Sequence, residues 1–322
     1  MCPQPRVTKN PLRLGRPRDW LIGTVLLIGL VIAVDRTVGW GDLLAPWRTM
    51  SPALLGLLLA LSALSWLLRA VRAYDFFQER VRGRFLTVVR LSLLHNVANN
   101  LLPMRSGELV FPWLMRRYFG HGFLSAGASL VWIRLLDLHF LVLIGLLILW
   151  LRAPSWWWPV AALAWLAAIV LLLWVRGRIP SGRTGLPWRL LRFAADAAPS
   201  GAALVARLYL WTAASWASKL LAFAVVMHHF VPVALWRVLA GVVGAELSSV
   251  LPFHGVAGSG SYELAGVAVL VPLGVGLDQA LAGAVNVHLF LLGVTLLMGA
   301  IALLLPIERG DVSPETEPSA RG

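Results

Sequence analysis

Residues 99–108 read NNLLPMRSGE, and this stretch decides the architecture because it sets polar and helix-breaking residues between two apolar segments. Proline removes a helical hydrogen bond, and glycine lowers helical stability. Among membrane spans, non-helical backbone persists only where protein buries it or where it lines an aqueous cavity. The break around Pro103 and Gly107 therefore predicts a re-entrant hairpin, or two tilted short spans, beside a polar cavity.

The sequence on either side predicts that the chain lies in a membrane. Its 322 residues are 59% hydrophobic and 13% charged, which is more apolar than a soluble domain needs. Several runs approach the ~20 residues with which a helix crosses the hydrocarbon core, at 20–38, 54–68, 123–151 and 280–305. We predict an all-α polytopic membrane protein with about six full spans plus two broken, re-entrant hairpins. Eight conventional spans are the alternative.

The basic residues predict the orientation and exclude nucleic acid as a partner. The net charge of +13 comes mainly from arginines between the apolar runs, which is the positive-inside pattern of membrane proteins. Segments 1–18, 69–90 and 176–207 should therefore be cytoplasmic, and the tryptophans at 156–158 should lie at the outer interface. We expect a multi-pass protein of the cytoplasmic (inner) membrane of a bacterium, with both termini in the cytoplasm.

The chain divides into three parts on this interpretation. Residues 1–18 form a basic cytoplasmic N-terminus, and residues 19–305 form a single membrane domain. Residues 306–322 form a polar tail that is expected to be disordered, because its composition offers no apolar surface to bury. Within 176–207, the stretch LPWRLLRFAADA predicts a basic amphipathic helix at the inner interface.

A second break, LPFHGVAGSGSYE, occupies residues 251–263 and is predicted to enter the membrane from the outer side. The two halves of the chain resemble each other, since residues 119–134 parallel residues 273–288 at an offset of 154. Interrupted segments at corresponding places in two halves indicate the substrate site of transporters with inverted repeats. We therefore predict an inverted repeat. Chance similarity between spans rich in glycine, alanine and leucine is the alternative.

Polar residues near the two breaks form the candidate site. Charged side chains inside spans usually face the bundle interior and a partner. Arg105 is predicted to pair with Glu108, and residues 134 and 137 share a helix face and can form an ion pair. The candidate substrate-binding residues are Asn100, Arg105, Glu108, Arg134, Asp137, His254 and Glu263, and the structural breaks are Pro103, Gly107, Pro252, Gly255, Gly258 and Gly260.

Signatures of enzymes were not found. There is no HExxH motif for a metalloprotease, and the run of alternating Gly and Ser at 258–261 lacks the full G-x-S-x-G elbow of a hydrolase. The single cysteine, Cys2, rules out a cysteine-based zinc site. We expect no catalytic residue, no metal and no cofactor. For Lys219, two interpretations stay open, an intramembrane role and a side chain that extends to the interface.

Three motifs resemble a known family. NNLLPMRSGE at 99–108, IRLLD at 133–137 and LPFHGVAGSGSYE at 251–263 are similar to the three marks of the lysylphosphatidylglycerol synthase transmembrane-region family, the flippase-like membrane domain. The resemblance covers residues 19–305, and the matching residues are the candidates named above except His254. The chain departs from the pattern at Met104, where a small residue is usual, and at Phe111 and Tyr262, where arginine is common.

The resemblance implies movement of a phospholipid or a polyprenyl-linked lipid between leaflets. On this hypothesis Arg105, Glu108 and Glu263 bind the headgroup or relay its charge, and alternating exposure of the site gives transport. The implied partners are membrane lipids, either anionic phospholipid or polyprenyl-linked lipid, together with enzymes of lipid biosynthesis. Full-length synthases also carry an aminoacyl-transferase domain after the membrane part, and we expect no aminoacyl transfer here.

Two other functions remain open from the residues alone. One is a membrane-embedded transferase acting on lipid-linked sugars, for which Asp35 and Asp42 would be the acidic pair. The other is a non-transporting scaffold for lipid or glycolipid biosynthesis. Charge-neutral changes at Glu108 and Glu263 would leave a scaffold functional, whereas they would stop a transporter.

Overall fold

The computed structural model describes residues 17–176, 178, 185–248 and 256–307, and all regular structure in these ranges is helical. The main helices are α1 (Pro17–Thr37), α2 (Trp40–Leu44), α3 (Pro52–Phe76), α4 (Gln78–Val81), α5 (Phe85–Leu101), α6 (Val110–Phe119), α7 (Phe123–Arg152), α8 (Trp157–Arg176), α9 (Leu186–Asp196), α10 (Ala202–Phe230), α11 (Leu235–Ser248), α12 (Ser261–Leu270) and α13 (Leu277–Leu304). Short 3₁₀ turns η1 (Ala45–Thr49), η2 (Pro103–Leu109) and η3 (Val256–Gly258) complete the described elements.

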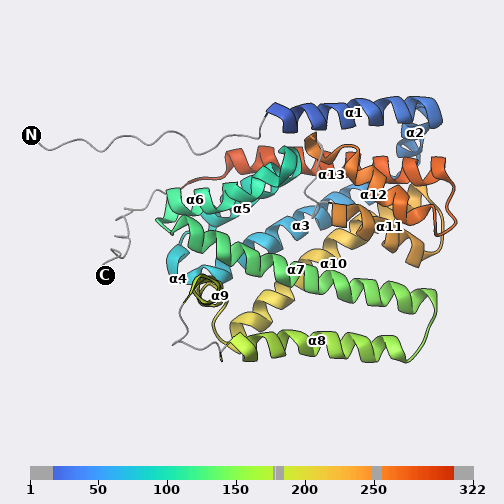
Figure 1. The fold of residues 1–322 in the computed structure, drawn as a ribbon. Coiled ribbons are helices and arrows are strands. Elements are labelled where there is room, and N and C mark those ends of the chain that lie inside the picture. The colour runs from blue at the N-terminus through green and yellow to red at the C-terminus, as the bar shows by residue number, and fades with distance from the viewer. Residues whose placement is uncertain (1–16, 177, 179–184, 249–255, 308–322) are drawn as a thin grey trace, which may run out of the picture.

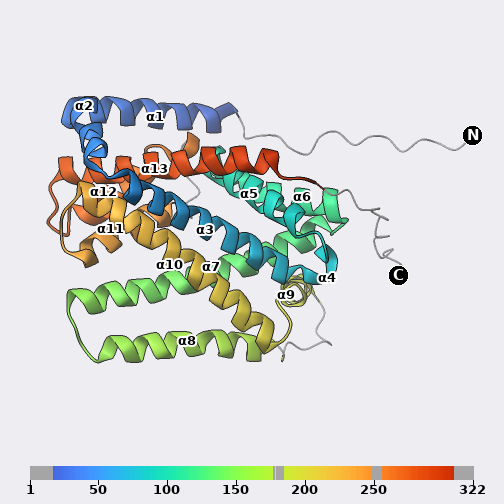
Figure 2. The same ribbon diagram turned by 180° about the vertical axis from the view of Figure 1, so that it is seen from behind.

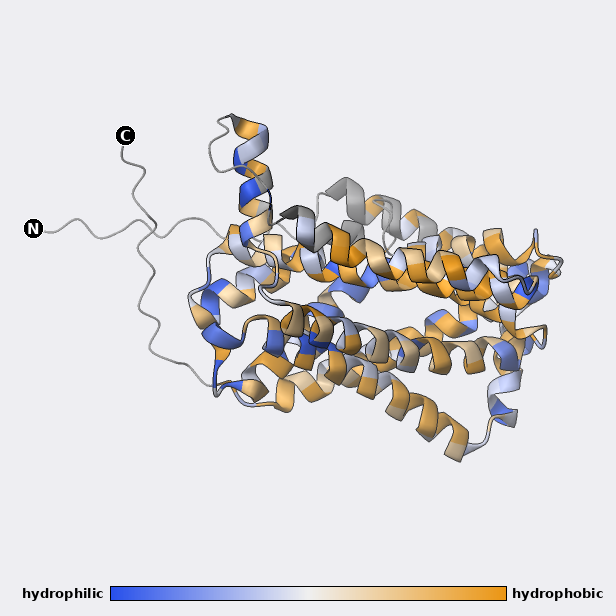
Figure 3. Cartoon of the chain, turned by 90° about the horizontal axis from the view of Figure 1, so that it is seen from below, coloured by the Kyte–Doolittle hydropathy of each residue, from blue (hydrophilic) through white to orange (hydrophobic). Residues whose placement is uncertain are grey.

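Six of the described helices, α1, α3, α7, α8, α10 and α13, have 20 or more residues and run between the same two ends of the bundle (Figures 1 and 2). Four of them, α3, α7, α10 and α13, are both long and apolar enough to cross a membrane. Their outward residues are mainly hydrophobic, and polar segments gather at the ends and in the centre (Figure 3). The predicted all-α polytopic fold is confirmed.

The two predicted breaks form hairpins that enter the bundle from opposite ends. Helix α5 runs inward from the end that carries α4 and α9, and α6 returns to that end (Figure 1). Helices α11 and α12 form the second hairpin from the end that carries α2. With 17 and 14 residues, α5 and α11 are too short to cross ~30 Å of hydrocarbon at 1.5 Å per residue. This arrangement agrees with six long helices plus two hairpins rather than with eight conventional spans.

Local sequence explains where several elements start and stop. Ser51 caps α3 by accepting a hydrogen bond from the Leu54 amide, and Pro52 follows at the first helical position. Gly120 ends α6 in the left-handed conformation (φ 66°) that glycine adopts without steric cost. The predicted amphipathic stretch forms α9 beside the start of α7.

One sequence interpretation needs correction. Segment 69–90 was expected to be a cytoplasmic loop, but its first two arginines lie inside α3. Arg72 is 3% exposed, and Arg69 faces the interior cavity described below. Arginine is rare inside spans and usually binds a buried partner. Counting these arginines with the loop residues therefore missed two members of the interior network.

The tips of the two hairpins meet in the middle of the bundle. Turn η2 contacts η3, α5 contacts α13 and η3, and α11 contacts α7. Helix α1 crosses over both tips, because it contacts η2 and η3. Helices α3 and α10 pack along each other and lie on the opposite side of the hairpin tips from α1 (Figure 1). The described backbone of the tips, in η2 and η3, is thus enclosed by protein, as membrane depth requires.

Gly107 is needed for the close approach of η2 to α5. A Cβ at this position would collide with backbone atoms of Ala98 and Asn99, which cannot move aside as a flexible side chain would. We expect Gly107→Ala to destabilise the protein by about 1–3 kcal/mol, the usual range for overpacking. Thermal unfolding in detergent measures this, with Gly145→Ala as the control because a Cβ at Gly145 meets no atom within 4 Å. Equal melting temperatures of the two variants would contradict the tight packing of this hairpin.

Candidate functional site

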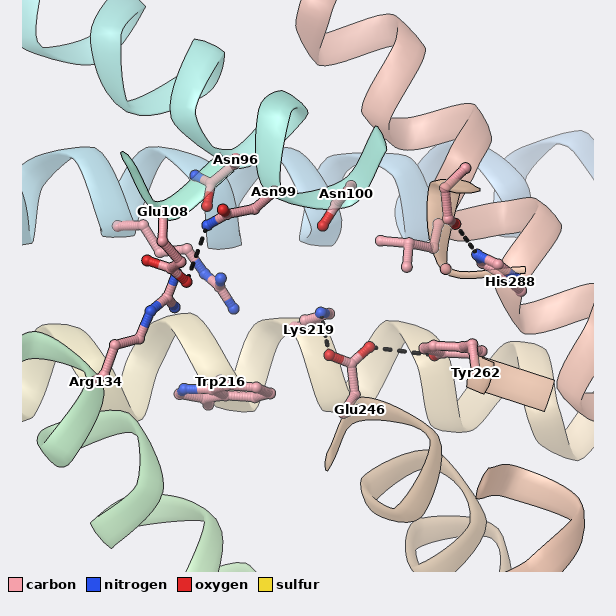
Figure 4. A pocket seen from close by; sticks show the side chains of 14 residues that line it. Asn96, Asn99, Asn100, Glu108, Arg134, Trp216, Lys219, Glu246, Tyr262 and His288 are labelled. Carbon is pink, nitrogen blue, oxygen red and sulfur yellow. Dashed lines mark hydrogen bonds and ion pairs between the residues drawn. The ribbon is translucent and has the colours of Figure 1, made fainter. Parts of the chain in front are cut away.

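A polar cavity of about 80 Å³ lies where the hairpin tips face α3, α7, α10 and α13. This volume holds several water molecules or one small polar group. Figure 4 shows asparagines of α5 on one side of the space and a lysine, a glutamate and a tyrosine on the other. The lining residues are Arg69, Asn96, Asn99, Asn100, Glu108, Arg134, Trp216, Lys219, Glu246, Ala257, Gly258, Tyr262, His288 and Leu291.

The first hairpin contributes an ion pair between its tip and α7. The Glu108 carboxylate lies 2.7 Å from the Arg134 guanidinium, and the Asn99 amide donates to the same carboxylate at 3.3 Å. The His95 ring lies behind them, with Nδ1 3.2 Å from the Gly107 carbonyl oxygen. This ion pair attaches the tip of the first hairpin to a long helix from outside the hairpin.

Behind this pair, Asp137 connects α7 to α3 and α10. One carboxylate oxygen accepts from Arg72 at 2.6 Å and from the Trp216 indole at 2.9 Å. The other lies 3.3 Å from Arg72 and 3.4 Å from Arg134, which confirms the predicted contact between residues 134 and 137. Asp137 is 5% exposed. Arg72 also donates to Thr212 at 2.7 Å, so a buried network of three helices supports the cavity wall.

The opposite wall holds a second ion pair. The Lys219 ammonium lies 2.5 Å from the Glu246 carboxylate, whose other oxygen accepts from the Tyr262 hydroxyl at 3.2 Å. The Lys219 side chain is 12% exposed and that of Glu246 is 5% exposed. Of the two interpretations, the structure therefore contradicts a side chain that extends to the interface and places Lys219 inside the bundle.

A third pair joins α12 to α13. Glu263 accepts from the Gly260 amide at 2.8 Å, and its other oxygen lies 2.5 Å from His288 Nδ1. His288 Nε2 lies 2.8 Å from the Ala257 carbonyl oxygen, which can only accept a hydrogen bond. Nε2 therefore carries a proton, and one further proton lies between Nδ1 and Glu263. The pair is neutral overall whichever partner holds that proton.

The structure brings most of the predicted site residues together. Asn100 lines the cavity and donates to Thr295 at 2.8 Å, and Glu108, Arg134 and Asp137 form the network above. Glu263 borders the cavity through His288. Gly258 and Gly260 have φ of 81° and 82°, so these two breaks need glycine. The backbone of Pro103 and Arg105 lies in η2, but the Arg105 side chain, Pro252, His254 and Gly255 lie outside the described residues.

The sequence analysis did not identify Arg69, Arg72, Trp216 or His288 as members of the site. One repeated sequence pattern could have identified Arg69 and Trp216. Ser65-Trp66 precedes Arg69 in α3, and Ser215-Trp216 precedes Lys219 in α10, both at an offset of 150 residues. The motif S-W-x-x-(Arg/Lys) thus occurs once in each half, on two helices that pack together.

Two residues that depart from the family pattern are also placed. Phe111 is 3% exposed and packs in an apolar cluster with Phe77 and Met115, away from the cavity lining. Tyr262 is 2% exposed, lines the cavity and stacks on His288 at 4.7 Å between ring centroids. Where the family pattern commonly has arginine, this chain thus has the hydroxyl of Tyr262, a neutral group that donates a hydrogen bond to Glu246.

These features define a class of polytopic α-helical membrane proteins in which two broken hairpins enclose a charged cavity. The family model described as the lysylphosphatidylglycerol synthase TM region matches residues 20–299, so the chain belongs to this flippase-like family. The resemblance seen in the three motifs is thereby confirmed. Neither a curated protein nor a solved structure matches the chain.

Proposed function

We propose that this protein moves or presents a phospholipid or a polyprenyl-linked lipid across the cytoplasmic membrane of a bacterium, with the headgroup in the cavity. The observation that carries the proposal is a charged cavity enclosed by apolar helices. An unpaired Arg, Asp or Glu at a span centre costs about 2.5–3.5 kcal/mol on insertion scales, so ionisable groups there usually serve a substrate or an ion. The cavity has room for a headgroup fragment, and acyl chains would remain in the bilayer.

An inverted repeat is part of the proposal. The first hairpin contacts α13, which follows the second hairpin, and the second hairpin contacts α7, which follows the first. The ion pair of Glu108 with Arg134 corresponds to that of Glu263 with His288, at offsets of 155 and 154 residues. Such exchange of contacts between halves supports alternating access, in which one half rocks against the other around a fixed site.

The wild-type protein is expected to accelerate lipid movement between leaflets. The measurement uses proteoliposomes with fluorescent phospholipids or a fluorescent polyprenyl phosphate, and a leaflet-selective quencher follows the exchange. Protein-free vesicles and vesicles with heat-denatured protein are the controls. Acceleration for at least one lipid supports the proposal. Rates equal to those of protein-free vesicles across the whole panel would overturn it and favour a scaffold or a transferase.

We further propose that both termini face the cytoplasm and that the protein catalyses no reaction. Helix α1 begins, and α13 ends, at the end of the bundle that carries α4 and α9 (Figure 2). We assign this end to the cytoplasm, because the loops there are the arginine-rich ones. Asp35 and Asp42, the pair required by the transferase alternative, are exposed and do not line the cavity. The protein would act on lipids without chemical conversion, beside enzymes of lipid biosynthesis.

A further inference from the structure

The two halves of the cavity differ at one pair of equivalent positions. Lys219 of α10 pairs with Glu246 of α11 at 2.5 Å. At an offset of 150 residues, the corresponding residues of the first half are Arg69 of α3 and Asn96 of α5. Asn96 therefore stands where the second half has a carboxylate. The cation of the first half lacks the partner that its counterpart has.

The surroundings of Arg69 agree with this difference. Among the described residues, no ion pair or hydrogen bond involves Arg69, and its Nε and Nη2 atoms are buried without an acceptor. Its guanidinium lies 5.1 Å from the Trp216 ring, and the Lys219 ammonium lies 5.4 Å from the same ring. Both cations thus flank one indole at the cavity wall. Asn96 lines the same cavity, and the described structure gives its amide no hydrogen-bond partner.

The charges around the cavity leave one positive charge uncompensated. The described lining holds three cations, Arg69, Arg134 and Lys219, but only two carboxylates, Glu108 and Glu246. Behind the wall, Arg72 and Asp137 balance each other, and the Glu263–His288 pair is neutral. A charge buried without a partner is strongly unfavourable. An anionic ligand beside Arg69 would remove that cost.

The geometry points to a phosphate-binding site at Arg69, with Asn96 as a second donor, that holds the phosphate of a lipid headgroup. A guanidinium suits a phosphate because it offers a planar pair of N–H donors to two oxygens, and the amide of Asn96 adds a neutral donor. The cavity of about 80 Å³ holds a group of this size and not a whole lipid. This inference rests on the proposed function and names the part of the substrate that the cavity recognises.

The test measures binding to the full-length protein in a non-ionic detergent by titration calorimetry. The probes are dihexanoylphosphatidylglycerol, inorganic phosphate and the uncharged dihexanoylglycerol. Arg69→Gln removes the guanidinium charge. Asn96→Asp keeps the shape of the side chain, replaces its amide with the carboxylate that the second half has, and should therefore pair with Arg69 and close the site. Arg207→Gln is the matched control, because Arg207 is 49% exposed and pairs with Asp75 outside the cavity.

We expect the wild type and Arg207→Gln to bind the phosphatidylglycerol equally, and Arg69→Gln and Asn96→Asp to bind it at least about tenfold more weakly, as loss of a charge-assisted hydrogen bond predicts. The uncharged diglyceride should not bind. Binding of inorganic phosphate with the same loss in both variants would assign the site to free phosphate as well. Since the described structure gives the Asn96 amide no hydrogen bond to lose, the melting temperature of Asn96→Asp should equal or exceed that of the wild type, which separates loss of the site from unfolding.

Unchanged phosphatidylglycerol affinity in Arg69→Gln and Asn96→Asp would overturn the inference. The lipid-movement assay distinguishes this failure from failure of the proposed function. If both variants still bind and move lipid as the wild type does, the transporter stands and the phosphate site is wrong. If wild-type binding depends on Arg69 but no lipid moves, the phosphate site stands and the transport proposal is wrong.

Discussion

Asp137→Asn is expected to lower the free energy of unfolding by about 3–5 kcal/mol, the cost of removing one partner from a buried ion pair. Asp137 accepts from Arg72 and Trp216 through one oxygen and contacts Arg134 through the other. Asparagine has nearly the same shape, so packing is preserved. Its amide nitrogen, however, would face donors instead of accepting from them. The buried Arg72 guanidinium would keep no carboxylate partner among the described residues.

Two comparisons isolate this effect. Arg207→Gln breaks an exposed ion pair with Asp75 and should cost about 0–1 kcal/mol. The double change Arg72→Met with Asp137→Leu removes both charges and should be more stable than Asp137→Asn, because an apolar pair of similar volume leaves no charge unpaired. Unfolding by steric trapping in bicelles measures all three. A loss for Asp137→Asn as small as that for Arg207→Gln would contradict the account of the buried network.

The overall fold could be predicted from the sequence because the spans of a membrane protein are long apolar runs that a hydropathy pattern reveals. Long apolar runs must be spans, and proline and glycine inside such runs must end helices. The breaks at residues 99–108 and 251–263 were predicted from that rule. The arginines within segment 69–90 were the exception, because a count of basic residues does not distinguish a loop from the last turns of a helix.

The candidate site was predictable in location and in the contact of Arg134 with Asp137 within one helix, but not in its pairings between elements. The structure pairs Glu108 with Arg134 on another element, a partner that the sequence did not predict; the side chain of Arg105, the predicted partner, lies outside the described residues. Lys219 pairs with Glu246, and Asp137 with Arg72, across 27 and 65 residues of sequence. Such partners depend on helix packing, which periodicity does not define. A comparison of the two halves of the sequence could have identified the two cations as equivalent, because Arg69 and Lys219 occupy the same position of the repeated S-W-x-x-(Arg/Lys) motif.

The two glutamates on the hairpins offer the sharpest functional variants. Glu108→Gln removes the charge that faces Arg134 and retains the size and the oxygen that accepts from Asn99. Glu263→Gln retains an acceptor for the Gly260 amide and can donate to His288 Nδ1, but it removes the proton shared with the histidine. Both variants should therefore fold; Glu108→Gln changes the net charge of the cavity, whereas Glu263→Gln removes the shared proton of a pair that is neutral overall.

The most direct test of lipid handling by this cavity is leaflet-resolved lipid movement in proteoliposomes that contain the wild type, Glu108→Gln, Glu263→Gln or Arg207→Gln. We expect each glutamine variant to reduce the accelerated rate by more than about tenfold, since a charge-assisted interaction of ~1.5–3 kcal/mol is lost, while Arg207→Gln keeps the wild-type rate. Wild-type rates in both glutamine variants would contradict the central claim, because lipid would then cross without using the charged cavity between the hairpins.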